Sequence, residues 1–285
     1  MSHRSAWPAK REKSLTPIAG TGGIRTGNIH SATRARLKRA ESFVTEMAAS
    51  EEARRSSRDA ILEIVRPAGG IGMMRNLLTR SRAITTGVHT SWRVGQVAIE
   101  GAEKGEANAC LILDADASVR WYASQPMAIF YRLAGIETYH IPDFEIVFSD
   151  GCIKLWEIQS DSRARQEDVL ERTQLMAREL PRLGYEYTVV THRELCAEPR
   201  LGTARELWRY GHQAVDLRTR ELVLNAIRRF GPISWGTILD GGLGPNGRDA
   251  VCRLTLEGVL HLDRSQPMSP RSCFSLAPAT QESLR

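Results

Sequence analysis

Two acidic residues flank a predicted hairpin in the segment HIPDFEIVFSDGCIKLWEIQS, residues 140–160. Two runs of strand-forming residues surround a turn whose Asp150-Gly151 pair is a strong hairpin signal. Because side chains alternate between the two faces of a strand, antiparallel pairing brings Asp143 and Glu157 side by side. Neighbouring carboxylates repel each other, and a divalent cation that prefers oxygen ligands, Mg²⁺ or Mn²⁺, relieves the repulsion. The spacing predicts a metal site here; an ordinary hairpin with two acidic residues is the alternative.

Composition limits the classes to which the chain can belong. It has 285 residues, of which 42% are hydrophobic, which suits one large or two small globular domains. No apolar run reaches about eighteen residues, so no membrane span is predicted, and the first residues lack the apolar core of a signal peptide. The five cysteines are scattered without a Cys-x-x-Cys pair, so we predict neither a zinc ribbon nor a disulfide framework. We therefore expect a cytoplasmic protein with reduced thiols.

Positive charge is concentrated near the beginning of the sequence. The formal net charge is +6, and residues 1–60 hold twelve Lys or Arg against six Asp or Glu. The densest basic cluster consists of Arg34, Arg36, Lys38 and Arg39. Such a cluster can contact the phosphates of a nucleic acid, and a solvated helix face is the alternative.

The N-terminal part is predicted to contain little sheet. Residues 1–30 are rich in Gly, Ser, Thr and Pro, which predicts a mobile basic arm. Residues 31–80 predict a helical region, since Ile61, Leu62 and Val65 have helical spacing and Pro and Gly residues follow them.

The central part, residues 81–198, is predicted to mix helices and strands. We expect strands in 82–100, a helix over 100–114, two strands interrupted at Gln125-Pro126, the hairpin described above, a polar helix over 162–183 and a strand over 185–191. This order of elements predicts an α/β fold with a mixed sheet.

The C-terminal part, residues 205–285, predicts three short helices followed by a hairpin. Ser234 can cap the second helix. This arrangement is typical of a winged helix-turn-helix, and its third helix carries Arg248 and Arg253 as candidate DNA contacts. A winged helix that binds another protein is the alternative.

The hairpin residues resemble the signature of a nuclease family. Pro142-Asp143, a spacing of fourteen positions (157 minus 143) and then Glu157-x-Gln159 are similar to the PD-(D/E)xK pattern, with Gln where the family usually has Lys. Residues 82–196 further resemble the N-terminal catalytic domain of TnsA-type transposon endonucleases. The matching pieces are Gly87 with Ser91, Glu103 with Glu106, Leu111 to Leu113, Val119, Gln125-Pro126, His140 with Pro142-Asp143-Phe144, and Val189-Val190-Thr191 with Glu194.

The resemblance implies a restriction-endonuclease-like core and a metal-dependent DNA endonuclease, which cuts at transposon ends by hydrolysing phosphodiester bonds. It implies that Glu106, Asp143 and Glu157 bind Mg²⁺ or Mn²⁺ and, together with Gln159, form the catalytic set. It also implies three partners: double-stranded DNA, a DDE-type transposase and an ATPase regulator.

Gln159 leaves the activity open. A lysine would orient a water molecule and offset negative charge, whereas a glutamine amide holds water without adding charge. Lys154 is predicted to face the opposite side of its strand, and Lys104 is a more plausible relocated cation. The alternatives are a catalytically inactive DNA-binding accessory or regulatory protein of a mobile element, and a stand-alone phage or defence nuclease.

Overall fold

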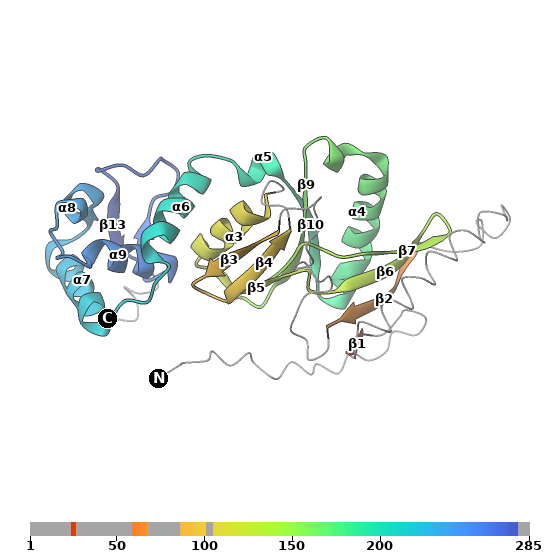
Figure 1. The fold of residues 1–285 in the computed structure, drawn as a ribbon, viewed down its shortest axis with the longest axis horizontal. Helices are drawn as coiled ribbons and strands as arrows, with labels where there is room; N and C mark the ends of the chain where they lie inside the picture. Colours follow the sequence, from red (N-terminus) through yellow and green to blue (C-terminus); the bar gives the residue numbers. More distant parts are fainter. Residues whose placement is uncertain (1–23, 27–58, 68–85, 101–104, 279–285) are drawn as a thin grey trace. The chain divides into compact units, whose positions relative to one another are not determined.

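The computed structural model describes residues 24–26, 59–67, 86–100 and 105–278 (Figure 1). The chain divides into two compact units. The first comprises Met1–Ile71 with Met127–His140, and the second comprises Gly72–Pro126 with Ile141–Arg285. Each unit combines segments that are distant in the sequence. In the described ranges, no helix is long and apolar enough to cross a membrane.

The first unit contains a sheet in which strands pair in the order β1-β2-β6-β7. Its strands are β1 (Ile24–Thr26), β2 (Ala60–Arg66), β6 (Ala128–Leu133) and β7 (Ile136–His140). β6 and β7 are joined by Ala134-Gly135, and both residues have a positive φ, as the tightest hairpin turns require. In β2, the register against β6 shifts between Ile61 and Glu63, which marks a bulge or irregularity.

The second unit is organised around a mixed sheet with the strand order β10-β9-β8-β5. Its strands are β5 (Val119–Ser124), β8 (Phe144–Phe148), β9 (Ile153–Gln159) and β10 (Glu186–Thr191). β10 runs parallel to β9, whereas β8 is antiparallel to both β9 and β5. The protein is therefore a mixed α/β protein whose central sheet is mixed, as the sequence predicts.

Two helices lie on opposite sides of this sheet: α3 (Glu106–Ala115) and α4 (Glu167–Glu179) (Figure 1). The buried face of α3 carries Ala109, Cys110 and Leu113, which form one core cluster with Phe144 of β8 and Ile158 of β9. α4 packs against β10. Alternate residues of β9 thus face different helices, which determines the surroundings of the acidic residues.

Shorter elements complete this half of the unit. They are β3 (Thr86–Ser91), β4 (Gly95–Glu100), the 3₁₀ turns η3 (Arg163–Arg165) and η4 (Leu180–Leu183), and α5 (His192–Leu195). β3 and β4 form a separate antiparallel hairpin. α5 begins with a capping box, in which Thr191 and Glu194 bind each other's backbone N–H groups.

A buried polar network connects the β3–β4 hairpin to α3. The carboxylate of Asp114 is fully buried and accepts hydrogen bonds from Ser91 Oγ at 2.5 Å and from Tyr122 Oη at 3.0 Å. His89 Nε2 lies 2.8 Å from the same carboxylate. Burial raises the pKa of the Tyr122 phenol well above its ordinary value, so this hydroxyl remains a donor.

The C-terminal module packs helices on a small sheet with the strand order β11-β13-β12. Its elements are α6 (Arg200–Gly211), α7 (Leu217–Phe230), β11 (Ile233–Ser234), α8 (Trp235–Leu239), α9 (Gly247–Leu256), β12 (Leu260–Leu262) and β13 (Cys273–Leu276). Ser234 caps α8 as predicted, since its side chain accepts from the N–H of Thr237. Val223, Trp235, Val251 and Phe274 are part of its buried core.

α6 lies close against α9 in this module. A Cβ atom added at Gly211 would lie 2.7 Å from the backbone nitrogen of Arg253, so the two helices approach each other through a position without a side chain. The Arg253 guanidinium lies 4.4 Å from the ring centroid of Trp92, and its Nε donates to Glu257 at 2.6 Å. These contacts connect the module to the β3–β4 hairpin.

Three elements differ from the prediction. Ile24–Thr26, within the predicted mobile arm, is a strand that pairs with β2. Ala60–Arg66 is a strand and not the end of a helix, because its residues pair with β6 and the bulge places the buried Ile61 and Ile64 three positions apart. The polar helix begins at Glu167, after a 3₁₀ turn, and not at Ser162. Residues 1–23 and 27–58, which include the rest of the predicted arm and helices, lie outside the described residues.

Candidate active site

The β8–β9 hairpin places two acidic residues on one face of the sheet. Its register pairs Phe144 with Trp156 and Glu145 with Leu155, so the next position toward the open end sets Asp143 opposite Glu157. Because alternate residues share a face, Glu145, Leu155 and Gln159 lie on the same side as these two carboxylates. This is the side on which α4 supplies a contact to Glu157.

Asp143 is fixed by backbone hydrogen bonds to two strands. Its Oδ2 accepts from the N–H of Ile158 at 2.6 Å, and its carbonyl oxygen accepts from the N–H of Gln125 at 2.8 Å. The first bond joins it to β9 between the two predicted site residues Glu157 and Gln159. The second holds it at the end of β5. The carboxylate therefore has a defined position before any ligand binds.

Glu157 is buried, with 6% of its surface exposed, and its charge is balanced within the protein. Its Oε1 accepts from Gln159 Nε2 at 2.6 Å and lies 3.3 Å from Nη2 of Arg172, a residue of α4. An ion pair at this depth is screened only weakly by solvent. Gln159 thus contacts the predicted ligand through its amide and adds no charge.

Tyr187 of β10 closes the same cluster. Burial raises the pKa of its phenol well above the ordinary value, and the negative charge of Glu157 raises that pKa further, followed by a smaller contribution from Asp143. Arg172 hydrogen-bonds the phenol and opposes these effects. Asp143, Glu157, Gln159, Arg172 and Tyr187 therefore form one polar cluster beneath α4, in which Glu157 and Tyr187 are buried and the other three are partly buried.

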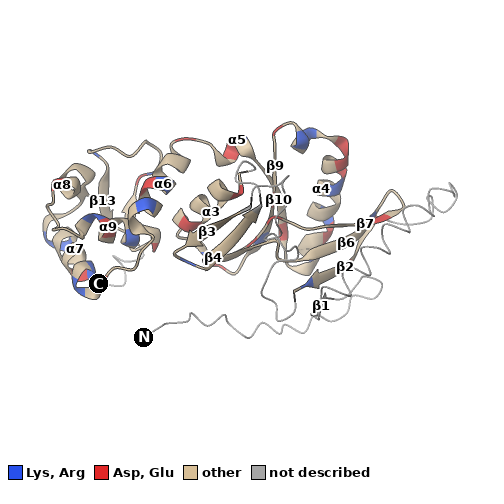
Figure 2. Ribbon diagram, viewed as in Figure 1, with Lys and Arg blue, Asp and Glu red and all other residues tan. Residues whose placement is uncertain are grey.

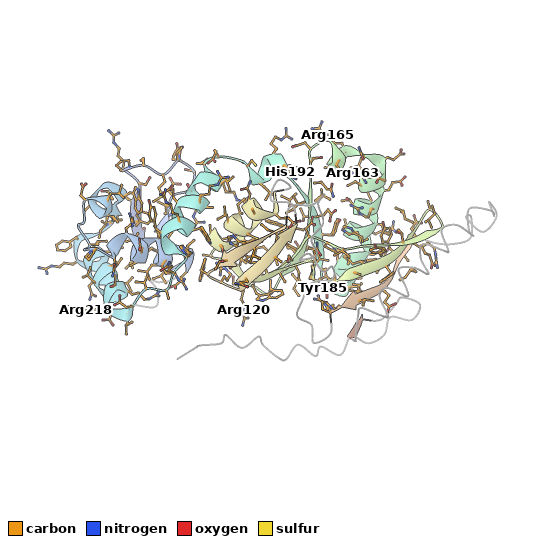
Figure 3. The ribbon with its side chains drawn as sticks, in the orientation of Figure 1. Arg120, Arg163, Arg165, Tyr185, His192 and Arg218 are labelled. Atoms are coloured by element: carbon orange, nitrogen blue, oxygen red, sulfur yellow. The ribbon has the colours of Figure 1, made fainter. Side chains whose placement is uncertain are left out.

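Glu106 lies at the first position of α3, and its side chain is also buried. The preceding Gly105 has a φ of 88°, and a Cβ atom there would lie 3.4 Å from Ile158 Cγ2 and 3.3 Å from Cδ2 of His192, which begins α5 and is labelled in Figure 3. The start of α3 is thus next to the residue whose N–H binds Asp143. Glu106 nevertheless does not complete a three-residue ligand group with Asp143 and Glu157, since no such group occurs among the described residues.

Oxygen ligands from Asp143 and Glu157 fit Mg²⁺ or Mn²⁺ chemically, and the hairpin holds both on one face. The expected third carboxylate is not gathered with them: in the described part of the chain, no three His, Cys, Asp or Glu side chains are arranged to hold a metal ion. The hairpin therefore offers such a cation the two facing carboxylates of Asp143 and Glu157.

Of the two lysines considered as substitutes for Gln159, Lys154 lies away from this cluster. Lys154 lies on the opposite face of β9, where its Nζ is 2.9 Å from Glu186, and the hydrogen bond to that carboxylate raises the pKa of the lysine. Lys104 lies outside the described residues. Lys154 instead lines a cavity of about 510 Å³ with Phe148, Trp156 and Arg200, on the face away from Glu157.

The predicted DNA contacts have different outcomes. Arg34, Arg36, Lys38 and Arg39 lie outside the described residues. Arg248 is partly exposed and stacks at 4.0 Å over the ring of Tyr210. The side chain of Arg253 is 15% exposed and contacts Glu257 and Trp92.

Sequence reasoning missed Arg172 and Tyr187. α4 carries both acidic and basic residues along its length (Figure 2), so Arg172 looks like one more surface charge. A helical projection would have distinguished it, because Arg172 lies three positions after the buried Val169 and four before the buried Met176. Tyr187 could have been assigned to the core from the alternation in its strand.

Comparison with protein-family models and with curated proteins finds no match to this chain.

Proposed function

We propose that this protein is a metal-dependent DNA endonuclease with a restriction-endonuclease-like core, which cuts DNA at the ends of a mobile element as TnsA-type enzymes do. The observation that carries this proposal is the pairing of Asp143 with Glu157 on one face of the β8–β9 hairpin. The order α3, β5, β8, β9, α4, β10 around a mixed sheet is consistent with such a core.

Asp143 and Glu157 would hold Mg²⁺ or Mn²⁺. When bound, such a cation lowers the pKa of a water molecule and offsets negative charge on a phosphate. The chain's own contribution is positional: Ile158 fixes the orientation of Asp143, while Gln159 and Arg172 fix that of Glu157. The amide of Gln159 has the donor and acceptor groups needed to hold a water molecule near these carboxylates.

The C-terminal module is proposed to be a winged helix-turn-helix that contributes to DNA binding. Because the side chain of Arg253 contacts other residues of the protein, the phosphate contacts of this module would come from other basic side chains. Arg218, Arg228 and Arg229 of α7 are exposed, and Arg218 points outward from the first turn (Figure 3). Phosphate contacts by these residues would make the affinity for DNA fall steeply with salt.

A DDE-type transposase and an ATPase regulator are the proposed protein partners, and the cytoplasm is the proposed location.

A second candidate is a DNA-binding accessory protein whose nuclease core is inactive. Two observations favour it: Glu157 is already paired with Arg172, and no three-residue ligand group occurs in the described residues. The two candidates differ in whether the chain binds a divalent cation at the hairpin. Titration of the full chain with Mn²⁺ in a calorimeter distinguishes them, since only the endonuclease requires binding that depends on Asp143.

The decisive experiment measures Mn²⁺-dependent nicking of DNA that carries the element's ends, in the presence of the proposed partner transposase. Asp143→Asn keeps an oxygen that can accept from Ile158 but removes the charge, and we expect it to lose nicking. Asp150→Asn is the matched control, because Asp150 is an exposed acidic residue in the turn of the same hairpin. Equal nicking by the wild type and Asp143→Asn would reject the proposed site.

A further inference from the structure

The family pattern places a lysine at position 159, and this chain has glutamine there. Gln159 Nε2 lies 2.6 Å from Glu157 Oε1, so position 159 still reaches the carboxylate that a lysine would neutralise. A neutral amide leaves the negative charges of Asp143 and Glu157 uncompensated from this position. A buried carboxylate such as Glu157, with a second carboxylate beside it, requires positive charge from another source.

Arg172 provides that charge from a different element. Its Nη2 lies 3.3 Å from the same Oε1 atom that Gln159 contacts, and the side chains of Arg172 and Glu157 are 15% and 8% exposed. The amide and the guanidinium therefore meet at one oxygen. Gln159 donates a short hydrogen bond to this oxygen, and Arg172 supplies the positive charge beside it.

The guanidinium is held in this position from two sides. α4 presents Arg172 on its buried face, between Val169 and Met176, and a hydrogen bond joins the guanidinium to the phenol of Tyr187 on β10. The other arginine of the same helix differs: Arg178 is 51% exposed and pairs with Glu179. Arg172 is thus built into the cluster and is not a surface charge that turns inward by chance.

We propose that Arg172 replaces the lysine that position 159 lacks, and that it is a positioning residue which supplies positive charge beside Glu157 and fixes the orientation of its carboxylate. This inference rests on the proposed endonuclease function for its effect on cleavage. The relocation of charge itself is a property of the folded chain and can be tested without cleavage.

The test compares full-length Arg172→Gln, Gln159→Lys and the double variant, with Arg178→Gln as the control on the same helix. Arg172→Gln should lower the midpoint of urea unfolding, because it leaves a buried carboxylate without its cation. Gln159→Lys should restore much of that loss in the double variant, because position 159 reaches the same oxygen. Arg178→Gln should leave the midpoint nearly unchanged.

Cleavage and metal affinity should change in opposite directions. Arg172→Gln should slow Mn²⁺-dependent nicking about 100-fold, the size of effect seen when one electrostatic contact is removed from an active site. Its affinity for Mn²⁺ should rise about tenfold, because a positive charge near the cation has been removed. The double variant should recover nicking and lose the extra affinity. A purely structural role would weaken both properties together.

The outcomes separate this inference from the function on which it rests. If Gln159→Lys restores neither the unfolding midpoint nor nicking in the Arg172→Gln background, the assignment of Arg172 is overturned. If the midpoint is restored while no variant, including the wild type, binds Mn²⁺ or nicks DNA, the relocated charge stands and the endonuclease function is rejected.

Discussion

The carboxylate of Asp143 accepts a hydrogen bond from the backbone N–H of Ile158, with Oδ2 2.6 Å from the nitrogen. The side chain of Asp143, next to β8, thus binds the backbone of β9 at Ile158, which lies between the candidate residues Glu157 and Gln159. Asp143 has a structural role in the hairpin as well as a proposed chemical one. A simple alanine substitution would mix these two effects.

Asp143→Ala and Asp143→Asn should separate the two roles. Alanine removes the acceptor for Ile158, so we expect the free energy of unfolding to fall by about 1–3 kcal/mol, the usual cost of leaving a buried donor unsatisfied. Asparagine keeps an acceptor and should cost clearly less, although both variants should lose Mn²⁺ binding. Urea unfolding at pH 7 measures the difference. Equal destabilisation by both variants would contradict a structural role for this bond.

The network around Asp114 should contribute strongly to stability. Asp114→Ala leaves the hydroxyls of Ser91 and Tyr122 without their acceptor in the core, and we expect a loss of about 3 kcal/mol or more. Asp116→Ala is the control, since the side chain of Asp116 accepts exposed hydrogen bonds from Ser118 and its loss should cost much less. Thermal and urea unfolding compare them. Similar losses at the two positions would show that the network adds little.

Gly211 should tolerate no side chain. A Cβ atom there meets the backbone of α9, with Arg253 N at 2.7 Å and Cys252 C at 2.8 Å, so Gly211→Ala should destabilise the protein by about 1–3 kcal/mol. Gly202→Ala, in the same helix, is the matched control. Its new Cβ meets the end of the Glu198 side chain, which can rotate away. The prediction fails if the two variants have equal unfolding midpoints.

Stability should depend on pH through Glu257. Partial burial would raise the pKa of this carboxyl, but hydrogen bonds from Arg220 and Arg253 outweigh that effect and the net pKa lies below the ordinary value of 4.5. Because the pKa is lowered in the folded state, the contribution is present above pH 4.5 and is lost as the pH falls through the folded pKa. Glu257→Gln should therefore destabilise the protein at pH 7, and this difference should shrink as the pH falls below 4.5. Urea unfolding across this range measures it, and a constant difference would contradict the assignment.

Much of the second unit can be predicted from local sequence signals. Asp150-Gly151 marks the β8–β9 hairpin, and alternation in its strands places Asp143, Glu157 and Gln159 on one face. Ser234 marks the start of α8. These features depend on turn and cap chemistry, which involves only a few neighbouring residues.

The remaining features depend on contacts that are distant in sequence. Ile61 and Ile64 are both buried at a helix-like spacing of three positions because a bulge interrupts β2. A bulge is defined by the partner strand and cannot be recognised from local sequence. Arg172 becomes informative only when α4 is placed against β9 and β10. Arg253 looks available for DNA until α6 and Trp92 are packed against α9.

The order β1-β2-β6-β7 has a consequence for shortened versions of the protein. β6 is an inner strand that pairs with β2 on one edge and with β7 on the other. A polypeptide that starts at residue 72 would retain β6 but lose β2, exposing backbone groups beside the apolar segment Ala128–Leu133. Such a bare edge recruits strands from other molecules. Trimming the N-terminal segment should therefore produce a protein prone to self-association, even though every candidate active-site residue is retained.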